Sequence, residues 1–161
     1  MRMFIEKGIC IGLILFAFSI LAGCAKDVGE SNVPKIAMTI RVSMSTLVDE
    51  GLRLLADKAP EQVAPTVDDL NAVVAQVSLY NDGTASVGDV TKTLADMLTR
   101  MNTRFEFVQD DNAALLLRTI ANLARLVEIY FVEAEVPADA VTYANAVAEG
   151  IKEGIVSYEG M

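Results

Sequence analysis

Carboxylates are the most plentiful side chains for acid–base chemistry in this chain, because histidine, the commonest general base, does not occur among its 161 residues. Acidic residues that are close in sequence form four pairs: Asp49-Glu50, Asp68-Asp69, Asp110-Asp111, and Glu133 with Glu135. Adjacent residues of a helix point about 100° apart, so these pairs are poorly placed to share a proton as a catalytic dyad. Asp68-Asp69 and Asp110-Asp111 fall at predicted helix starts, where capping is the favoured interpretation.

Thiol and metal chemistry is limited in the same way. Cys10 and Cys24 both lie in the first 24 residues, so the remainder has no thiol for a disulfide, a zinc site or a nucleophile. The missing histidine removes Ser-His and Cys-His systems and the Glu-x-x-His di-iron site of helical bundles. The stretch from Asn81 to Asp89 lacks the ligand pattern of a calcium loop. We therefore predict no catalytic residue, no metal and no cofactor, and interpret the protein as a non-enzyme.

Basic residues form two lines on predicted helices. Arg118, Asn122 and Arg125 recur at 4-3 spacing and share one narrow strip. This strip is either solvated, or paired with acids of neighbouring helices, or part of a cleft that binds an anionic group. Arg100 and Arg104 form a second line, expected on the surface. The net charge of −9 opposes contact with phosphate backbones, so we predict no nucleic-acid partner.

The first 24 residues are built like a secretory signal. Arg2 and Lys7 give a positive start, residues 8–20 (GICIGLILFAFSI) are apolar, and the small residues Ala22 and Gly23 precede Cys24. The stretch Leu21-Ala22-Gly23-Cys24 resembles the lipobox of bacterial lipoproteins. The resemblance covers residues 1–24. It implies that a signal peptidase recognises Leu21, Ala22 and Gly23, that the Cys24 thiol receives a diacylglyceryl group, and that cleavage precedes Cys24.

The same resemblance implies a place in the cell. An acylated Cys24 would attach the protein to the lipid bilayer of the cell envelope. In the lipoprotein class, aspartate after the cysteine retains the protein in the inner membrane. Because Ala25 follows here, the resemblance implies the periplasmic face of the outer membrane in a host with two membranes.

Two other interpretations of this segment stay open. The uncharged run from Gly8 to Ala25 would be about 27 Å long as a helix, near the lower limit for an uncleaved membrane anchor. A buried core helix is the second. With the lipobox, the chain divides into a signal peptide (1–23), a lipidated cysteine with a flexible tether (24–35), and a helical domain (36–161).

Apolar residues at 3-4 spacing predict five helices and no strand, and hence an all-α, compact bundle of four to five helices. The expected helices cover about 34–59, 66–80, 86–108, 110–132 and 137 onwards. Thr66 with Asp69, and Ser86 with Asp89, have the spacing of a capping box. The helix at 110–132 is apolar around most of its circumference and is expected to be the central one.

The last helix carries two lines of interest. Val141, Ala144, Ala148, Ile151, Ile155 and Tyr158 form its expected buried line. Ala146, Gly150 and Gly154 recur every four residues, although each glycine costs about 1 kcal/mol in a helix relative to alanine. Packing against another helix of the chain is the favoured explanation. A subunit or partner contact, and tolerance near a fraying end, are the alternatives.

The leading hypothesis is therefore a membrane-anchored cell-envelope lipoprotein. Its non-catalytic helical domain would contact another envelope protein or a second copy of itself. The alternative is an envelope binding module for an apolar or anionic small ligand, in which Met44, Met97 and Met101 could form an adaptable lining. Ordinary core packing is the more usual role of such methionines.

Overall fold

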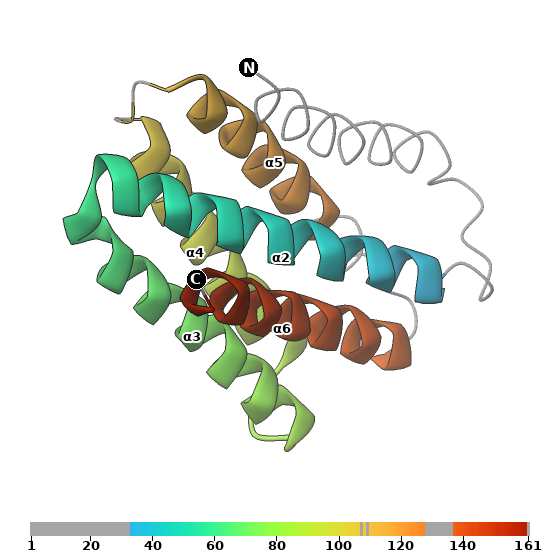
Figure 1. Cartoon of the computed structure of the whole chain (residues 1–161). Helices are drawn as coiled ribbons and strands as arrows, with labels where there is room; N and C mark the ends of the chain where they lie inside the picture. The colour runs from blue at the N-terminus through green and yellow to red at the C-terminus, as the bar shows by residue number, and fades with distance from the viewer. Residues whose placement is uncertain (1–32, 107, 109, 128–136, 161) are drawn as a thin grey trace.

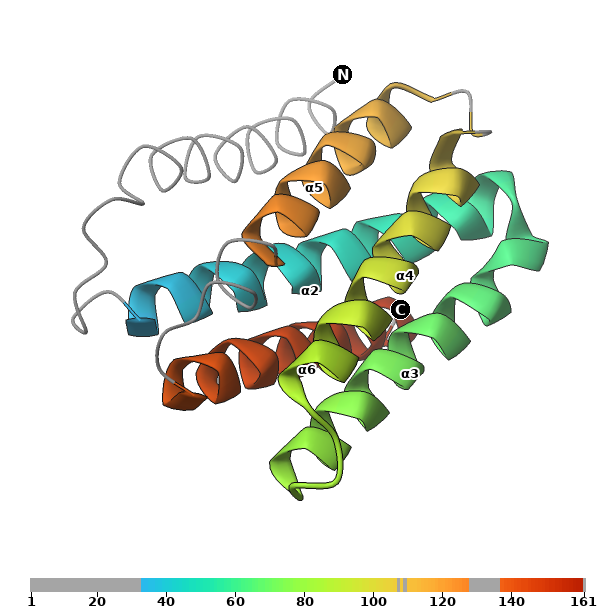
Figure 2. The same cartoon turned by 180° about the vertical axis from the view of Figure 1, so that it is seen from behind.

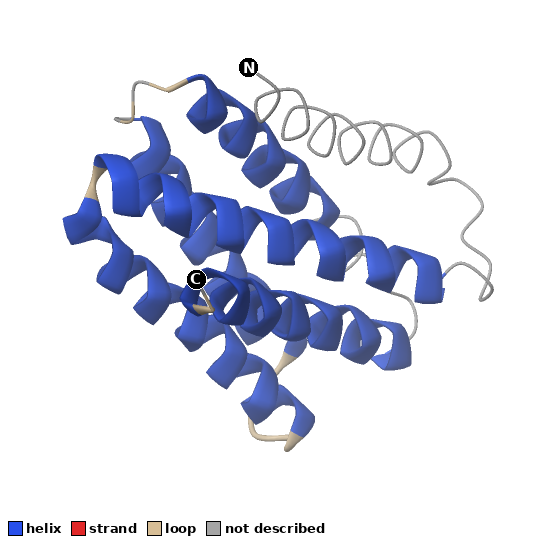
Figure 3. Cartoon of the chain, in the orientation of Figure 1, coloured by secondary structure: helices blue, strands red, loops and turns tan. Residues whose placement is uncertain are grey.

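The computed structural model describes residues 33–106, 108, 110–127 and 137–160. These residues form five α-helices and one 3-10 turn, with no strand among them (Figure 3). The prediction of an all-α bundle is confirmed. In chain order, the elements are α2 (Val33–Lys58), η2 (Pro60–Gln62), α3 (Val63–Asn81), α4 (Val87–Glu106), α5 (Asp111–Val127) and α6 (Pro137–Glu159).

The main contacts of the five helices form a ring, in the order α2, α6, α3, α4, α5 and back to α2, and α2 also contacts α3. The contact between α2 and α6 is the most extensive of these. The two helices lie side by side and run in the same direction, blue to teal for α2 and orange to red for α6 (Figures 1 and 2). The first and the last described helices therefore form the main interface of the bundle.

The central helix is α2, not the helix at 110–132, so that prediction is wrong. Ten residues of α2 are buried: Ile36, Ile40, Ser43, Met44, Leu47, Val48, Gly51, Leu52, Leu54 and Leu55. On α5, one side is exposed to solvent through Ala114, Arg118, Ala121, Ala124 and Arg125. The reason is that α5 packs mainly on α4 and α2 among the described helices, and its outer side carries alanine and arginine, for which burial brings little gain.

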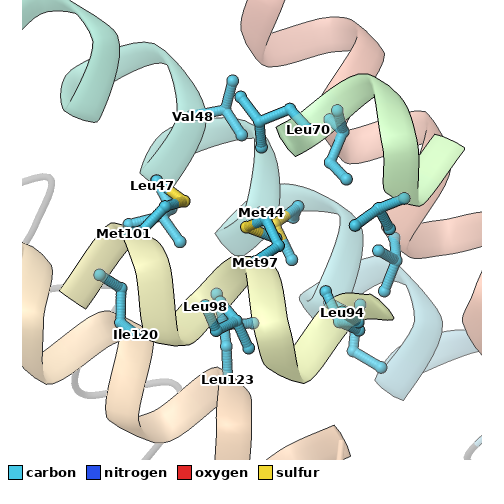
Figure 4. Packing of buried hydrophobic residues seen from close by; sticks show 14 of the residues in the cluster. Met44, Leu47, Val48, Leu70, Leu94, Met97, Leu98, Met101, Ile120 and Leu123 are labelled. Atoms are coloured by element: carbon cyan, nitrogen blue, oxygen red, sulfur yellow. The ribbon is translucent and has the colours of Figure 1, made fainter. Parts of the chain in front are cut away.

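The core fills the inside of the ring. Met44, Met97 and Met101 are fully buried and pack with leucines of α2, α4 and α5, which places them in the core (Figure 4). Phe105 of α4 is also fully buried and reaches α2 at Gly51, where an added Cβ would lie 3.0 Å from the ring. The gap that Gly51 leaves in the apolar line of α2 is thus filled from the neighbouring helix.

Two of the helix caps that the sequence predicts are confirmed, and a third is wrong. At α4, the Ser86 amide donates to Asp89 Oδ2 over 2.8 Å and the Asp89 amide donates to Ser86 Oγ over 3.2 Å, which confirms the capping box. At α5, Asp110 Oδ1 accepts the Asn112 amide over 2.8 Å, which is the expected cap. After α3, Gly83 adopts a positive φ of 73° in the expected turn.

The predicted capping box of Thr66 with Asp69 is wrong. The helix α3 begins earlier, at Val63, so Pro65 lies in its first turn, where a missing amide donor costs nothing. Thr66 is fully buried, and its hydroxyl donates to the Gln62 carbonyl over 2.7 Å.

The buried line of α6 differs in part from the predicted one. Val141 is 37% exposed and does not belong to it, whereas Ala140, Tyr143 and Val147 do. The cause is that α6 packs on both α2 and α3, which widens and turns its buried face.

Candidate functional site

The predicted lipid-attachment site lies outside the described residues. Cys24 and the peptidase residues Leu21, Ala22 and Gly23 all precede Val33, where α2 begins. No helix among the described residues is both long enough and apolar enough to cross a membrane. The described domain therefore offers three features to consider: the small-residue line of α6, the ionic clusters, and a groove between α2 and α5.

The line of small residues on α6 faces α2. Ala146 is buried, and a Cβ added to Gly150 would collide with the Arg41 carbonyl oxygen and would lie 2.9 Å from Met44 Cβ. A Cβ added to Gly154 would lie 2.5 Å from Val48 Cβ and 2.7 Å from the Ser45 carbonyl oxygen. Arg41 and Ser45 are one helical turn apart, as are the two glycines. The two backbones approach closely over at least this turn, which residues with side chains would prevent.

Charged side chains flank this close contact. The guanidinium of Arg41 on α2 lies 2.7 Å from Glu149 Oε2 and pairs also with Glu153, both on α6. The hydrogen bond from Arg41 lowers the pKa of Glu153. Twelve residues further along α2, Arg53 binds Asp49 of its own helix and donates to the Ser157 carbonyl of α6 over 3.1 Å. Arginines thus join α2 and α6 at two levels.

A second ionic cluster connects α3 and α4. Asp69 Oδ1 lies 2.9 Å from Arg100 Nε, and Asp69 Oδ2 lies 2.7 Å from Arg104 Nη1 in an ion pair that is not aligned as a hydrogen bond. Arg104 and Asp69 are only 14% and 16% exposed. The expectation that Arg104 lies on the surface is therefore wrong, because this carboxylate holds it between the two helices. Arg100 and Arg104 are spaced by four residues, a spacing that lets both face one acid on a neighbouring helix.

The strip of Arg118, Asn122 and Arg125 lies on α5. Both arginines are exposed and Asn122 is half-buried. None of the three lines the groove that α5 forms with α2. Among the described residues, the two arginines of the strip thus lie on the solvent-exposed side of α5.

A groove with a volume of about 210 Å³ lies between α2 and α5. Its apolar wall consists of Leu47, Leu54, Leu115 and Leu116. Its polar lining comprises Ser43, Thr46, Glu50, Arg53, Asp57, Asp110, Asn112 and Thr119. Because three carboxylates and one guanidinium line it, the groove is acidic.

Sequence reasoning missed the two groove residues with the most available chemistry, Ser43 and Glu50. They share one 3-4-3-4 line of α2 with Ile40, Leu47 and Leu54. Polar residues that interrupt an otherwise apolar line are the signal that could have identified them. The methionines proposed as a ligand lining do not line the groove, since Met44, Met97 and Met101 are buried in the core.

Glu133 and Glu135 lie outside the described residues, so the search for a metal centre concerns the other carboxylates. Among the described residues, no group of three or more acids and cysteines is close enough to hold a metal ion. Asp89 and Asp110 cap helices, and Asp69 and Glu153 pair with arginines. Comparisons with protein-family models, with curated proteins and with solved structures find no match to this chain.

Proposed function

We propose that the chain is a cell-envelope lipoprotein, anchored to the bilayer through an acylated Cys24, with a non-catalytic helical domain. The observation that carries this proposal is the stretch Leu21-Ala22-Gly23-Cys24 directly after an uncharged, apolar run. A thioether-linked diacylglyceryl group, with or without a third acyl chain, provides the two-chain attachment that lasting anchorage needs.

The position of the domain relative to Cys24 supports this proposal. Eight residues lie between Cys24 and Val33, where α2 begins, and the nine Cα-to-Cα steps across them span at most about 32 Å when extended. The start of α2 would thus stay within about one bilayer thickness of the membrane surface. Near this end of α2, Met38 and Val42 are 63% and 44% exposed. Such apolar side chains are favourable next to the lipid interface, so we propose that this end of α2 faces the bilayer.

The proposal of a non-catalytic role rests on the side chains available. The sequence has no histidine, and its two cysteines precede the domain. Among the described carboxylates, Asp89 and Asp110 cap helices, and Asp69, Glu149 and Glu153 pair with arginines. Contact with another envelope protein, or with a second copy of the chain, is the role we propose for the domain.

The anchor is tested with two matched cysteine variants. Cells that express the full chain are grown with an alkyne-tagged fatty acid, and the purified protein is examined for label and for mass. We expect Cys24→Ser to lose the label and to accumulate as an uncut precursor. Cys10→Ser, in the apolar run, should be labelled and cut like the unchanged chain.

Other outcomes would contradict the lipobox. If both variants keep the label, another residue is acylated. If the unchanged chain carries no label and stays in the membrane fraction at full length, the segment is an uncleaved anchor. Cross-linking in intact envelopes together with light scattering of the purified protein tests the partner role, and a monomer without any cross-linked protein would argue against it.

A further inference from the structure

Ser43 is a buried polar residue in the wall of the groove between α2 and α5. It is 1% exposed, and its hydroxyl makes no hydrogen bond within the described residues. The two other hydroxyls of the groove differ from it. Thr46 donates to the Val42 carbonyl over 3.0 Å, and Thr119 donates to the Leu115 carbonyl over 3.1 Å. The Ser43 hydroxyl is therefore available as a hydrogen-bond donor to a molecule in the groove.

Glu50 is the groove carboxylate that has no direct partner within the described residues. The other charged groups are engaged: Asp57 with Lys58, Arg53 with Asp49, and Asp110 with the Asn112 amide. Glu50 is half-buried and lies near enough to Arg53 to help raise the pKa of that guanidinium. A half-buried carboxylate without a hydrogen-bonded cation favours a positively charged group at this point.

The two groups are arranged along one face of α2. Ser43 and Glu50 are seven residues apart, which places them about 10 Å apart along the helix axis. Leu47 lies between them, and Leu115 and Leu116 face it from α5. The groove thus offers a hydrogen-bond donor at one level, a carboxylate two turns further, and an apolar wall between the two.

We propose that this groove binds a small organic amine in its protonated form. The ammonium would pair with Glu50, an apolar body would lie against Leu47 and Leu116, and a hydrogen-bond acceptor at the far end would accept from Ser43. The volume of about 210 Å³ suits a molecule the size of a substituted aromatic amine. The acidic lining disfavours the anionic ligand that the sequence left open. This proposal does not depend on the lipid anchor.

The test uses a charge-matched pair of probes, 4-methoxyphenethylamine and 4-methoxyphenylpropionic acid, with the full chain in a maltoside detergent. Leucine methyl groups are isotope-labelled, and their NMR shifts are followed during titration. We expect the amine to shift Leu47 and Leu116 methyls and to bind at least about tenfold more tightly than the acid, because a charge-assisted contact is lost with the acid.

Three variants locate the interaction. Glu50→Gln keeps the shape and removes the charge, and should weaken amine binding at least about tenfold. Ser43→Ala should weaken it about threefold to tenfold, as expected for one neutral hydrogen bond. Glu61→Gln, an exposed acid of η2 outside this groove, should leave the affinity unchanged. Equal affinity for amine and acid, unchanged affinity of Glu50→Gln, or titration without shifts at Leu47 and Leu116 would each overturn the proposal.

Discussion

The two sides of α2 show how differently one helix can be packed. Toward α6, glycines replace side chains, backbones touch, and arginines bridge the two helices. Toward α5, leucines meet only partly, and a groove of about 210 Å³ lined by Ser43 and Glu50 remains. Both sides belong to one regular helix, so the difference in packing comes from the size of the residues at each contact. The α6 side therefore fixes how the two helices pack, whereas the α5 side has room for another molecule.

The largest expected effect breaks the close contact on the α6 side. Gly150→Leu would place a branched side chain against the Arg41 carbonyl, which cannot rotate away. We expect the free energy of unfolding to fall by about 4 kcal/mol, above the usual cost of overpacking. Urea titration followed by circular dichroism measures this change.

The control for this variant is Gly88→Ala at the start of α4, where an added Cβ meets nothing closer than Ser86 Oγ at 3.5 Å. It should not destabilise the protein, since alanine is the better helix former. If Gly150→Leu were as stable as Gly88→Ala, the α2–α6 contact would not be as close as described.

Two matched truncations to alanine, one on α6 and one on α5, compare how tightly the two sides of α2 are packed. Ile151 on α6 is fully buried, and Leu116 on α5 is 6% exposed at the edge of the groove. Ile151→Ala should cost about 3 kcal/mol and Leu116→Ala about 2 kcal/mol, because Leu116 already borders a cavity and loses fewer contacts. The same urea titrations measure both, and a larger loss for Leu116→Ala would reverse our ranking of the two interfaces.

The smallest expected effect concerns the exposed ion pairs beside the glycines. Arg41 lowers the pKa of Glu153 in the folded protein, so the charged carboxylate stabilises the fold at neutral pH. This contribution is lost as the pH falls through that lowered pKa. Glu153→Gln should therefore melt below the unchanged protein at pH 7, and the difference should vanish in strong acid.

Glu159→Gln, in the last turn of α6 and without an ion pair in the described part of the chain, serves as the control for this prediction. Its melting temperature should follow that of the unchanged protein at both pH values. A deficit of Glu153→Gln that persists unchanged in acid would show that the ion pair with Arg41 is not its cause.

Periodicity predicted the helices well because burial of an apolar face determines them. The starts of α2 and α6 were predicted to within one residue, and the Ser86–Asp89 box marks α4 correctly. Local sequence signals predicted the wrong role for a side chain where its partner is distant in sequence. Asp69 looks like a cap in sequence but binds Arg100 and Arg104 of the next helix.

The groove was beyond the reach of sequence reasoning for the same reason. Whether Ser43 faces a partner helix closely or borders a cavity depends on how far α5 lies from α2, and no spacing in either segment encodes this distance. The glycines of α6 were easier to interpret, because a costly residue repeated every turn demands a close neighbour. Which neighbour it is, α2, could only be learned from the structure.

The pairing of the first and last described helices also constrains the order of folding. Arg41 and Glu153 are 112 positions apart, so the interface between α2 and α6 has a high contact order. The α3–α4 hairpin can form early from local contacts, but α2 waits for its main partner until α6 has been synthesised. Until then, the nascent chain keeps the most extensive interface of the described bundle open.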